Sequence, residues 1–261
     1  MKSALIGYTG FVGSNILAQM QFDDLYNSKN IKSIKGKEYE IVYCAGLPAA
    51  KWIANEKPTE DLQNLCYLID SIREMEANKF VLISTIDVYS SALGVDEDSF
   101  INLSTHHAYG IHRRLMENFI SERFNCHYII RLPGLFGDGL KKNIIYDFVN
   151  NNNINVIDSE AIFQFYSLED LVNDINIVIE NNINLVNFAT EPISVKELVR
   201  DSLELDFNNN LKFSVPYYDV RTKYAEMFGK KDVYIQSKEE VLRKIKKFMK
   251  KSRIKKSGIV R

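Results

Sequence analysis

KSALIGYTGFVGS, residues 2–14, is the stretch of sequence that decides the fold. Residues 4–6 form an apolar run of the length of a buried strand. Gly7, Gly10 and Gly13 follow at G-x-x-G-x-x-G spacing, and apolar residues at helical spacing begin among them. A glycine turn between a strand and a helix lets the backbone approach a pyrophosphate closely and directs N–H groups at it. The stretch therefore predicts a dinucleotide site; the alternative is a plain turn between a strand and a helix.

Short apolar strands alternate with helical patterns along the rest of the chain. We expect strands over residues 25–26, 40–46, 80–83, 128–132 and 185–188, and helices over residues 58–72, near 144–149 and from about 168. This alternation is typical of α/β proteins with a doubly wound parallel sheet of the Rossmann type. The expected domains are a core of residues 1–136 and 168–189, a small C-terminal substrate lobe of residues 137–167 and 190–240, and a basic helix or tail of residues 241–261.

Composition indicates a globular protein that contains no metal centre and no membrane span. The chain has 261 residues, of which 46% are hydrophobic, so a sizeable core can form. Cys44, Cys66 and Cys126 lie far apart without C-x-x-C spacing, which argues against disulfides and zinc and for the reducing cytoplasm. No apolar run approaches the roughly 20 residues that a membrane helix needs, and we find no signal peptide. We therefore expect a cytoplasmic protein.

The last 19 residues are strongly basic. Residues 243–261 contain ten Lys or Arg and no acidic residue, whereas the chain before them is acidic. Because the basic residues are confined to one terminus, we do not expect a nucleic-acid partner. Apolar residues recur at helical spacing at Val241, Leu242, Ile245, Phe248 and Met249. They predict an amphipathic helix that packs on the acidic body or on a second subunit, with an anionic membrane surface as the alternative.

The residues after the second expected strand bear on which dinucleotide binds. Residues 27–30 read Asn-Ser-Lys-Asn. An acidic side chain at this point accepts a hydrogen bond from a free ribose 2′-hydroxyl, whereas basic and small polar groups admit a 2′-phosphate. The absence of an acid and the presence of Lys29 favour NADP over NAD, with Asn27 and Lys29 near the ribose. The alternative is that Lys29 is simply solvated.

Two further stretches resemble the motifs of a known enzyme family. STIDVY, residues 84–89, follows the expected strand 80–83, and YGIHRRLME spans residues 109–117. Here the chain resembles the extended short-chain dehydrogenase/reductase family of nucleotide-sugar epimerases, dehydratases and reductases. In that family an S-[ST]-x-x-V-Y strand end works with a Y-x-x-x-K helix. The resemblance implies that Thr85 is the catalytic hydroxyl and Tyr109 the catalytic tyrosine, with Arg113 in place of the lysine.

The resemblance extends over nearly the whole chain. RLPGLFG at 131–137, FYSLEDL at 165–171, NFA at 187–189 and the stretch 194–198 resemble later motifs of the family in the same order. The family's 4,6-dehydratases carry Asp-Glu directly after the catalytic Thr, whereas this chain has Ile86 and Asp87. Because isoleucine cannot transfer a proton, we do not expect dehydration. Reduction of a keto-sugar, oxidation of a sugar hydroxyl and epimerisation through a ketone stay open.

Elementary chemistry supports the same residues. A phenol has a pKa near 10 and acts as a base at neutral pH only if its anion is stabilised. A cation at Arg113, one helical turn after Tyr109, would provide this stabilisation, and Thr85 would hold the same oxygen. Arginine keeps its charge but is not geometrically interchangeable with lysine, and Glu117 could pair with it. Tyr109 could otherwise be an ordinary surface tyrosine, and Thr85 an ordinary strand-end hydroxyl.

The candidate site residues fall into two groups besides the catalytic Thr85, Tyr109 and Arg113. Those expected at the cofactor are Gly7, Thr9, Gly10, Phe11, Val12, Gly13, Asn27, Lys29, Ala45, Gly46, Tyr109, Arg113 and Pro133. Those expected at the substrate are Asp87, His107, Lys142, Asn143 and Gln164. His106 and His107 lack a third ligand at metal spacing, so they predict no metal site; a solvated loop is the alternative. Trp52 is either a core residue or a wall of the pocket.

These observations predict an NAD(P)-dependent oxidoreductase or epimerase that acts on a nucleotide-linked sugar. The substrate lobe is short, so the sugar nucleotide would be partly exposed or shared with a second subunit, and a homodimer is expected. The alternative is a nucleotide-binding regulatory or scaffold protein of the same fold that has lost turnover, which Arg113 supports.

Overall fold

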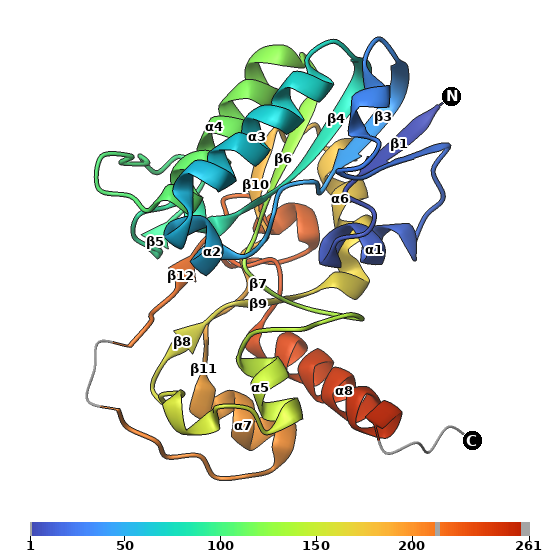
Figure 1. Cartoon of the computed structure of the whole chain (residues 1–261). Coiled ribbons are helices and arrows are strands. Elements are labelled where there is room, and N and C mark those ends of the chain that lie inside the picture. The colour runs from blue at the N-terminus through green and yellow to red at the C-terminus, as the bar shows by residue number, and fades with distance from the viewer. Residues whose placement is uncertain (1, 212–214, 257–261) are drawn as a thin grey trace. The chain divides into compact units, whose positions relative to one another are not determined.

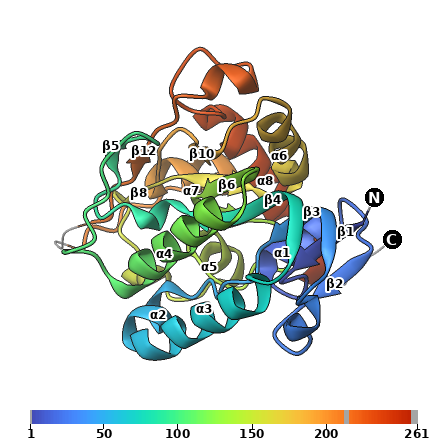
Figure 2. The same cartoon turned by 90° about the horizontal axis from the view of Figure 1, so that it is seen from above.

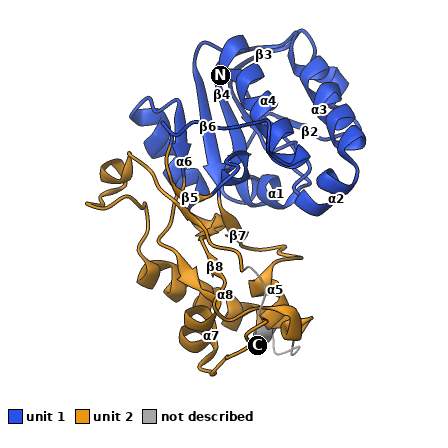
Figure 3. Ribbon diagram, turned by 90° about the vertical axis from the view of Figure 1, so that its left-hand side faces the viewer, with its two compact units in different colours: residues 1–91, 97–132, 170–187 blue, residues 92–96, 133–169, 188–261 orange. Residues whose placement is uncertain are grey.

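The computed structural model describes residues 2–211 and 215–256, and the chain divides into two compact units (Figure 3). Unit 1 comprises residues 1–91, 97–132 and 170–187. Unit 2 comprises residues 92–96, 133–169 and 188–261. This division places residues 92–96, 133–136, 168–169 and 188–189 in unit 2, whereas the sequence predicted them in the core. It also places the basic terminus in unit 2, whereas the sequence predicted a separate helix or tail.

Unit 1 is built on a six-stranded parallel sheet (Figure 1). Its strands are β1 (Ser3–Ile6), β2 (Asp24–Tyr26), β3 (Glu38–Cys44), β4 (Glu76–Thr85), β6 (His127–Leu132) and β10 (Leu185–Asn187). Their order is β2-β1-β3-β4-β6-β10, and every neighbouring pair is parallel. The direction of the strand order reverses at β1, which is the feature of a doubly wound sheet. The predicted Rossmann-type α/β fold is therefore confirmed.

Helices cover both faces of this sheet. They are α1 (Phe11–Leu17), α2 (Lys51–Glu56), α3 (Pro58–Ile72), α4 (Ala108–Arg123) and α6 (Leu171–Glu180), with short 3₁₀ turns η1 (Ile31–Ile34), η2 (Ile86–Val88) and η4 (Leu168–Asp170), the last at the boundary with unit 2. Figure 2 shows α3 and α4 side by side on one face and α6 on the other. Parallel strands covered in this way are buried on both sides, which explains their nearly continuous apolar sequences.

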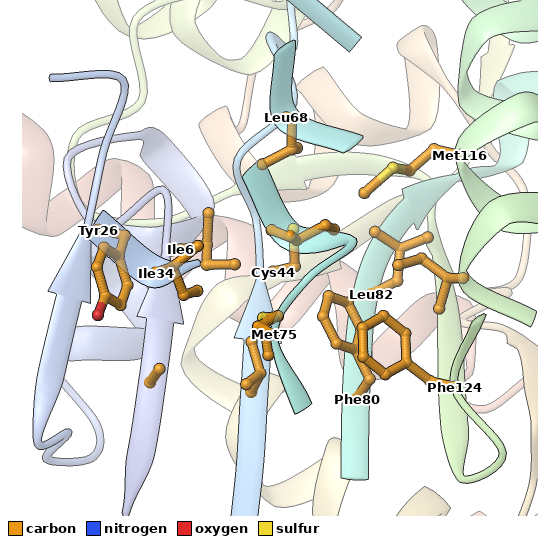
Figure 4. Packing of buried hydrophobic residues seen from close by; sticks show 14 of the residues in the cluster. Ile6, Tyr26, Ile34, Cys44, Leu68, Met75, Phe80, Leu82, Met116 and Phe124 are labelled. Atoms are coloured by element: carbon orange, nitrogen blue, oxygen red, sulfur yellow. The ribbon is translucent and has the colours of Figure 1, made fainter. Parts of the chain in front are cut away.

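The core of unit 1 lies between the sheet and the inner faces of α3 and α4. Leu68 of α3 and Met116 of α4 point toward Cys44 and Leu82 of the central strands (Figure 4). The rings of Phe80 and Phe124 stack with their centroids 4.4 Å apart, which joins β4 to the chain just beyond α4. This packing holds α4 against β4, and the candidate catalytic residues lie at the carboxyl end of β4 and at the start of α4.

Unit 2, over its described residues, consists of three two-stranded sheets and three helices. The strand pairs are β5 (Leu93–Val95) with β12 (Asp219–Val220), β7 (Gly134–Phe136) with β9 (Phe165–Ser167), and β8 (Ile162–Phe163) with β11 (Ile193–Ser194). The helices are α5 (Ile144–Asn150), α7 (Val195–Leu203) and α8 (Lys238–Lys256), with 3₁₀ turns η3 (Ile154–Val156) and η5 (Ala225–Phe228). Apolar side chains of α5, α7 and α8 form a second core with Phe136 and Phe165.

Helix α8 contains most of the basic terminus and belongs to unit 2. Its buried residues are Val241, Leu242, Ile245 and Met249. Lysines on its outer face pair with acidic residues of the same unit: Lys246 with Glu204 at 2.7 Å, Lys247 with Glu169 at 3.2 Å and Lys251 with Asp138 at 3.3 Å. Because exposed ion pairs contribute little, the apolar face anchors the helix. Residues 257–261 of the predicted tail lie outside the described residues. In the described part of the chain, no helix is long and apolar enough to span a membrane.

Candidate active site

The glycine turn between β1 and α1 packs against the end of β3. Gly7 has a φ of +86°, and a Cβ atom there would overlap the carbonyl group of Ala45. A Cβ atom at Gly13 would overlap the carbonyl group of Gly7. Gly46 is also tight, because its Cβ would lie 2.9 Å from the side chain of Ile6. These glycines are therefore required by the packing of the turn itself, and they bring the predicted residues of both loops together.

Gly10 differs from its two neighbours in the motif. Its backbone is extended, with φ −78° and ψ 170°, which any residue can adopt. A Cβ there would meet only the carbonyl oxygen of Gly7, at 3.3 Å. The fold thus gives little reason for glycine at this exposed position, whereas the close approach of a phosphate group gives one. Gly10 also leaves the start of α1 without a side-chain cap. The turn therefore fits the pyrophosphate of a dinucleotide.

Asn27 directly follows β2 and is held in place by its own turn. Its Oδ1 accepts a hydrogen bond from the backbone N–H of Lys29 at 2.9 Å, and its Nδ2 donates to the hydroxyl of Tyr8 at 3.2 Å. Asn30 closes the turn by donating from Nδ2 to the carbonyl oxygen of Leu25. Lys29 is exposed, and no acid occurs in residues 27–30. Tyr8, inside the glycine turn, is a neighbour of this position that sequence reasoning missed.

Thr85 and Tyr109 lie close enough for the Thr85 side chain to influence the ionisation of the Tyr109 phenol. Thr85 ends β4, and its Oγ1 also accepts from the backbone N–H of Asp87 at 3.1 Å. Tyr109 lies in the first turn of α4 and is 8% exposed, so it is not a surface tyrosine. Burial raises the pKa of the Tyr109 phenol, and the charge of Arg113 and the hydrogen bond from Thr85 offset part of this rise. The site thus holds a phenol whose ionisation depends on the charges around it.

Arg113 packs against the ring of Tyr109 and forms an ion pair with Asp61. Its guanidinium is 4.1 Å from the centroid of the tyrosine ring. Nη1 and Nη2 donate to the two carboxylate oxygens of Asp61, at 2.5 and 3.0 Å, and Nη2 also donates to the carbonyl oxygen of Pro48. His112 contacts the same carboxylate through Nδ1 at 2.7 Å. Burial would raise the pKa of Asp61, but the hydrogen bonds from Arg113 and His112 outweigh it and lower that pKa.

Sequence reasoning missed Asp61, although its position carries a signal. Asp61, Leu65, Leu68 and Ile72 lie at helical spacing on the buried face of α3. An acid on an otherwise apolar helix face is buried only when it has a partner. The pattern therefore indicates that a cation meets α3 from a neighbouring element, and in the structure that cation is Arg113.

Glu117 does not pair with Arg113, and this alternative was wrong. Its carboxylate is fully buried and accepts from Nε and Nη2 of Arg131, at 2.9 and 2.7 Å. Arg114 and the hydroxyl of Ser84 complete its hydrogen bonds. The physical reason is the direction of the side chain: Glu117 faces the sheet and reaches β4 and β6. It therefore anchors α4 on the sheet.

The two histidines before Tyr109 organise the start of α4. His107 is the N-cap, and its Nδ1 accepts from the backbone N–H of Gly110 at 3.0 Å. His106 places Nε2 2.9 Å from the carbonyl oxygen of Asp87. Burial lowers the pKa of His107, which favours the neutral imidazole that its capping role requires. Among the described residues there is no group of three or more His, Cys, Asp or Glu that could hold a metal ion.

Helix α2, which the sequence analysis did not predict, adds residues to this site. Asn55 accepts the backbone N–H of Tyr109 at Oδ1, at 3.0 Å. Lys51 places Nζ 2.7 Å from Oδ1 of Asp87. Trp52 lies on the same helix and is 65% exposed, so it is not a core residue. The short helix therefore connects the loop after β3 to both η2 and α4.

The remaining predicted residues belong to unit 2. Asn143 caps α5 by accepting the backbone N–H of Tyr146 at 3.1 Å. Lys142 is exposed, and Pro133 begins the second stretch of this unit. Gln164 is buried, and its amide exchanges two hydrogen bonds with the backbone of Val220, at 2.7 and 2.8 Å. Because Gln164 has this structural role, we leave it out of the substrate site that we propose.

Comparisons with known proteins show where this fold occurs. No model of a protein family and no curated protein sequence matches the chain. Among solved structures, the chain is similar to a UDP-N-acetylglucosamine 4-epimerase from Methanobrevibacter ruminantium M1, in complex with UDP-N-acetylmuramic acid. The two are 16% identical with a TM-score of 0.73, over 95% of this chain and 97% of the other.

Two further structures are similar over nearly their full length. A UDP-glucose 4-epimerase from Thermotoga maritima, with UDP-glucose, is 15% identical with a TM-score of 0.71, over 98% of this chain and 99% of the other. A dTDP-4-dehydrorhamnose reductase from Yersinia enterocolitica is 14% identical with a TM-score of 0.72, over 97% of this chain and 100% of the other. Other structures of this fold are complexes with NAD or NADPH. From end to end, the chain thus has the fold of the extended short-chain dehydrogenases/reductases that act on nucleotide sugars.

Proposed function

We propose that this protein is an NAD(P)-dependent oxidoreductase or epimerase that acts on a nucleotide-linked sugar. The observation that carries the proposal is the pair of hydroxyls of Thr85 and Tyr109, which lie close enough for Thr85 to influence the ionisation of the buried phenol. They lie at the carboxyl end of β4, in the same unit as the glycine turn. In doubly wound sheets, ligands bind at the carboxyl ends of the strands.

The chemistry divides between the dinucleotide and the chain. NAD(P), when bound, exchanges a hydride with a carbon of the sugar. The matching proton must reach or leave the oxygen on that carbon, and the Tyr109 hydroxyl is the group placed to move it. Thr85 donates to or accepts from the same oxygen and so orients it. Burial keeps Tyr109 protonated, which suits proton donation to a carbonyl; the reverse direction requires cations that stabilise the phenolate.

The glycine turn supports the binding of the dinucleotide. Gly7, Gly10 and Gly13 would hold the pyrophosphate, with Thr9 exposed beside them and the backbone of Phe11 and Val12 at the start of α1. Ala45 and Gly46 would lie beside the cofactor, because their backbone packs directly against Gly7 of the turn.

The ribose position lacks an acid, and this supports the preference for NADP. Asn27 and Lys29 would lie near the ribose, with Tyr8 beside them. Pro133 and the substrate contacts at Asp87, His107, Lys142 and Asn143 are further parts of the proposal. Dehydration is not proposed, because Ile86 follows Thr85 and is buried.

The nucleotide that copurifies with the protein tests this proposal. The full chain is purified without added nucleotide, denatured, and the released small molecules are identified by mass. We expect NADP or NAD, and calorimetry should show tighter binding of NADPH than of NADH to the emptied protein. If neither dinucleotide is released nor bound, the proposal fails at its first step. The expected homodimer is tested separately by the native mass in solution.

One observation favours a second candidate function. Arg113 donates to Asp61 and Pro48, a set of contacts that the single ammonium group of a lysine would not make in full. A protein of this fold that binds the dinucleotide as a regulator or scaffold, without turnover, would tolerate such a substitution. Full occupancy by the cofactor with no redox change across a panel of sugar nucleotides would support this second function over the first.

A further inference from the structure

The charge of Arg113 lowers the pKa of Tyr109, but its pairing with Asp61 offsets part of that charge. Both oxygens of Asp61 accept hydrogen bonds from the guanidinium of Arg113. Asp61, Arg113 and Tyr109 are all buried. Arg113 also contacts the face of the tyrosine ring, at 4.1 Å from its centroid, rather than the hydroxyl. A cation paired in this way has a weaker net field at a third group than a cation alone. A second cation near the phenol would therefore add to the effect of Arg113 on its ionisation.

Lys51 is such a second cation. Its ammonium is 2.7 Å from the carboxylate of Asp87, whose backbone N–H donates to the side-chain oxygen of Thr85. The helix that carries Lys51 is fixed to α4, because Asn55 accepts the backbone N–H of Tyr109. Lys51 is also a flexible point charge with its side chain 37% exposed, unlike the locked guanidinium.

We propose that Lys51 is the positioning residue that tunes the ionisation of Tyr109, and that its partner Asp87 sets how much of that charge the phenol experiences. This inference rests on the proposed function insofar as Tyr109 transfers a proton. It assigns to helix α2 a cation of the kind that the Y-x-x-x-K helix carries in the family that the chain resembles.

The charged groups around Tyr109 allow the effect of the Lys51 charge on the phenol to be distinguished from a structural role of its ion pair with Asp87. The groups that face it are Arg113 on its own helix, with Asp61 of α3 behind it, His107 at the helix start, Lys51 of α2 and Asp87 beside Thr85. The positive charge of Lys51 lowers the pKa of Tyr109, and the negative charge of Asp87 raises it. The two members of one ion pair thus act on the phenol with opposite signs. A purely structural ion pair would give the same sign whichever partner was removed.

The test uses this difference in sign. Tyr109 is replaced by 3,5-difluorotyrosine in the full chain, without cofactor, because fluorination makes the phenol more acidic and its ¹⁹F shift reports ionisation. We expect Lys51→Met to raise the pKa of this residue by roughly 0.5 to 1, and Asp87→Asn to lower it by a similar amount. The double variant should return close to the starting value, and Lys51→Arg should stay near it. Circular dichroism confirms that each variant is folded.

A matched control is available on the same segment. Lys57 is the N-cap residue of α3, and its ammonium lies 3.8 Å from the carboxylate of Glu60. Lys57→Met removes the same charge without a contact to Asp87 and should leave the titration unchanged. Shifts of one sign in both single variants, or no shift in either, would overturn the role of Lys51.

The same variants separate this inference from the proposed function. In an active enzyme, the acidic limb of the pH profile of kcat/KM should move in the same directions as the ¹⁹F titration. Opposite ¹⁹F shifts in a protein that turns over no sugar nucleotide would support Lys51 and count against the proposed function alone. Turnover with unchanged ¹⁹F titrations would support the proposed function and overturn the role of Lys51.

Discussion

Replacing Arg113 by lysine restores the Y-x-x-x-K spacing, and the structure shows what this change would remove. The guanidinium reaches both oxygens of Asp61, the carbonyl oxygen of Pro48 and the face of the Tyr109 ring at once. An ammonium is a point charge without the planar fork, so it can keep one of the two bonds to Asp61. We therefore expect Arg113→Lys to destabilise the protein and to lower turnover.

The magnitude of the destabilisation is the sum of the interactions that an ammonium cannot make. One charge-assisted hydrogen bond to the buried Asp61 carboxylate contributes about 1.5 kcal/mol, and the bond to the carbonyl oxygen of Pro48 about 1 kcal/mol. Stacking of the guanidinium on the Tyr109 ring adds about 1 kcal/mol. Partial relaxation around the smaller ammonium leaves a loss of roughly 3 kcal/mol. For a chain of this size, that corresponds to a decrease in Tm of roughly 6 °C or more.

Thermal and urea unfolding followed by circular dichroism measure this loss. Arg73→Lys is the matched control, because Arg73 is exposed and its nearest acidic partner, Asp70, is 3.6 Å away. The control should change the free energy of unfolding by less than about 0.5 kcal/mol. An Arg113→Lys protein as stable as the unchanged chain would refute the account of a buried, two-pronged ion pair with Asp61.

The remaining predictions concern the glycine turn, the buried acid and the last helix. Gly10→Ala should fold normally but lose at least tenfold in NAD(P) affinity by calorimetry, whereas Gly13→Ala should fail to fold because its Cβ overlaps the backbone. Asp61→Asn should be destabilised by about 3 kcal/mol at pH 7, because it leaves Arg113 unpaired. The folded-state pKa of Asp61 is lowered, so its contribution is present above its ordinary pKa of 3.8 and is lost as the pH falls through the folded value. The difference in urea stability between the two proteins should therefore shrink as the pH is lowered below about 4. Removing the residues after Glu240 should lower Tm, because the apolar face of α8 belongs to the core of unit 2; an unchanged Tm would contradict that packing.

Local patterns in the sequence predicted the fold well. Helix α3 begins and ends as expected, since Pro58 suits the first helical turn and the apolar residues of the helix recur at helical spacing. The parallel sheet followed from the alternation of elements. Helix α2 was missed because it has only six residues and carries the exposed Trp52, so no apolar face marks it.

The pairing of charges was harder to predict than the elements. The sequence suggested Glu117 as the partner of Arg113 because the two are one helical turn apart. In the structure, Arg113 pairs with Asp61, 52 residues away, and Glu117 pairs with Arg131. Such partners depend on which helices lie side by side, and a single sequence contains that information only indirectly. Lys51 and Asp87 were missed as a pair for the same reason.

The central claim is that Tyr109 moves the proton during turnover. Its most direct test is the turnover of Tyr109→Phe on the sugar nucleotide that the unchanged protein converts, with cofactor affinity measured on the same samples. The substitution removes one oxygen from a buried ring, so folding and NAD(P) affinity should persist. The account predicts that kcat falls by about 10²-fold or more, the scale of general acid–base catalysis. Undiminished turnover by Tyr109→Phe would contradict it.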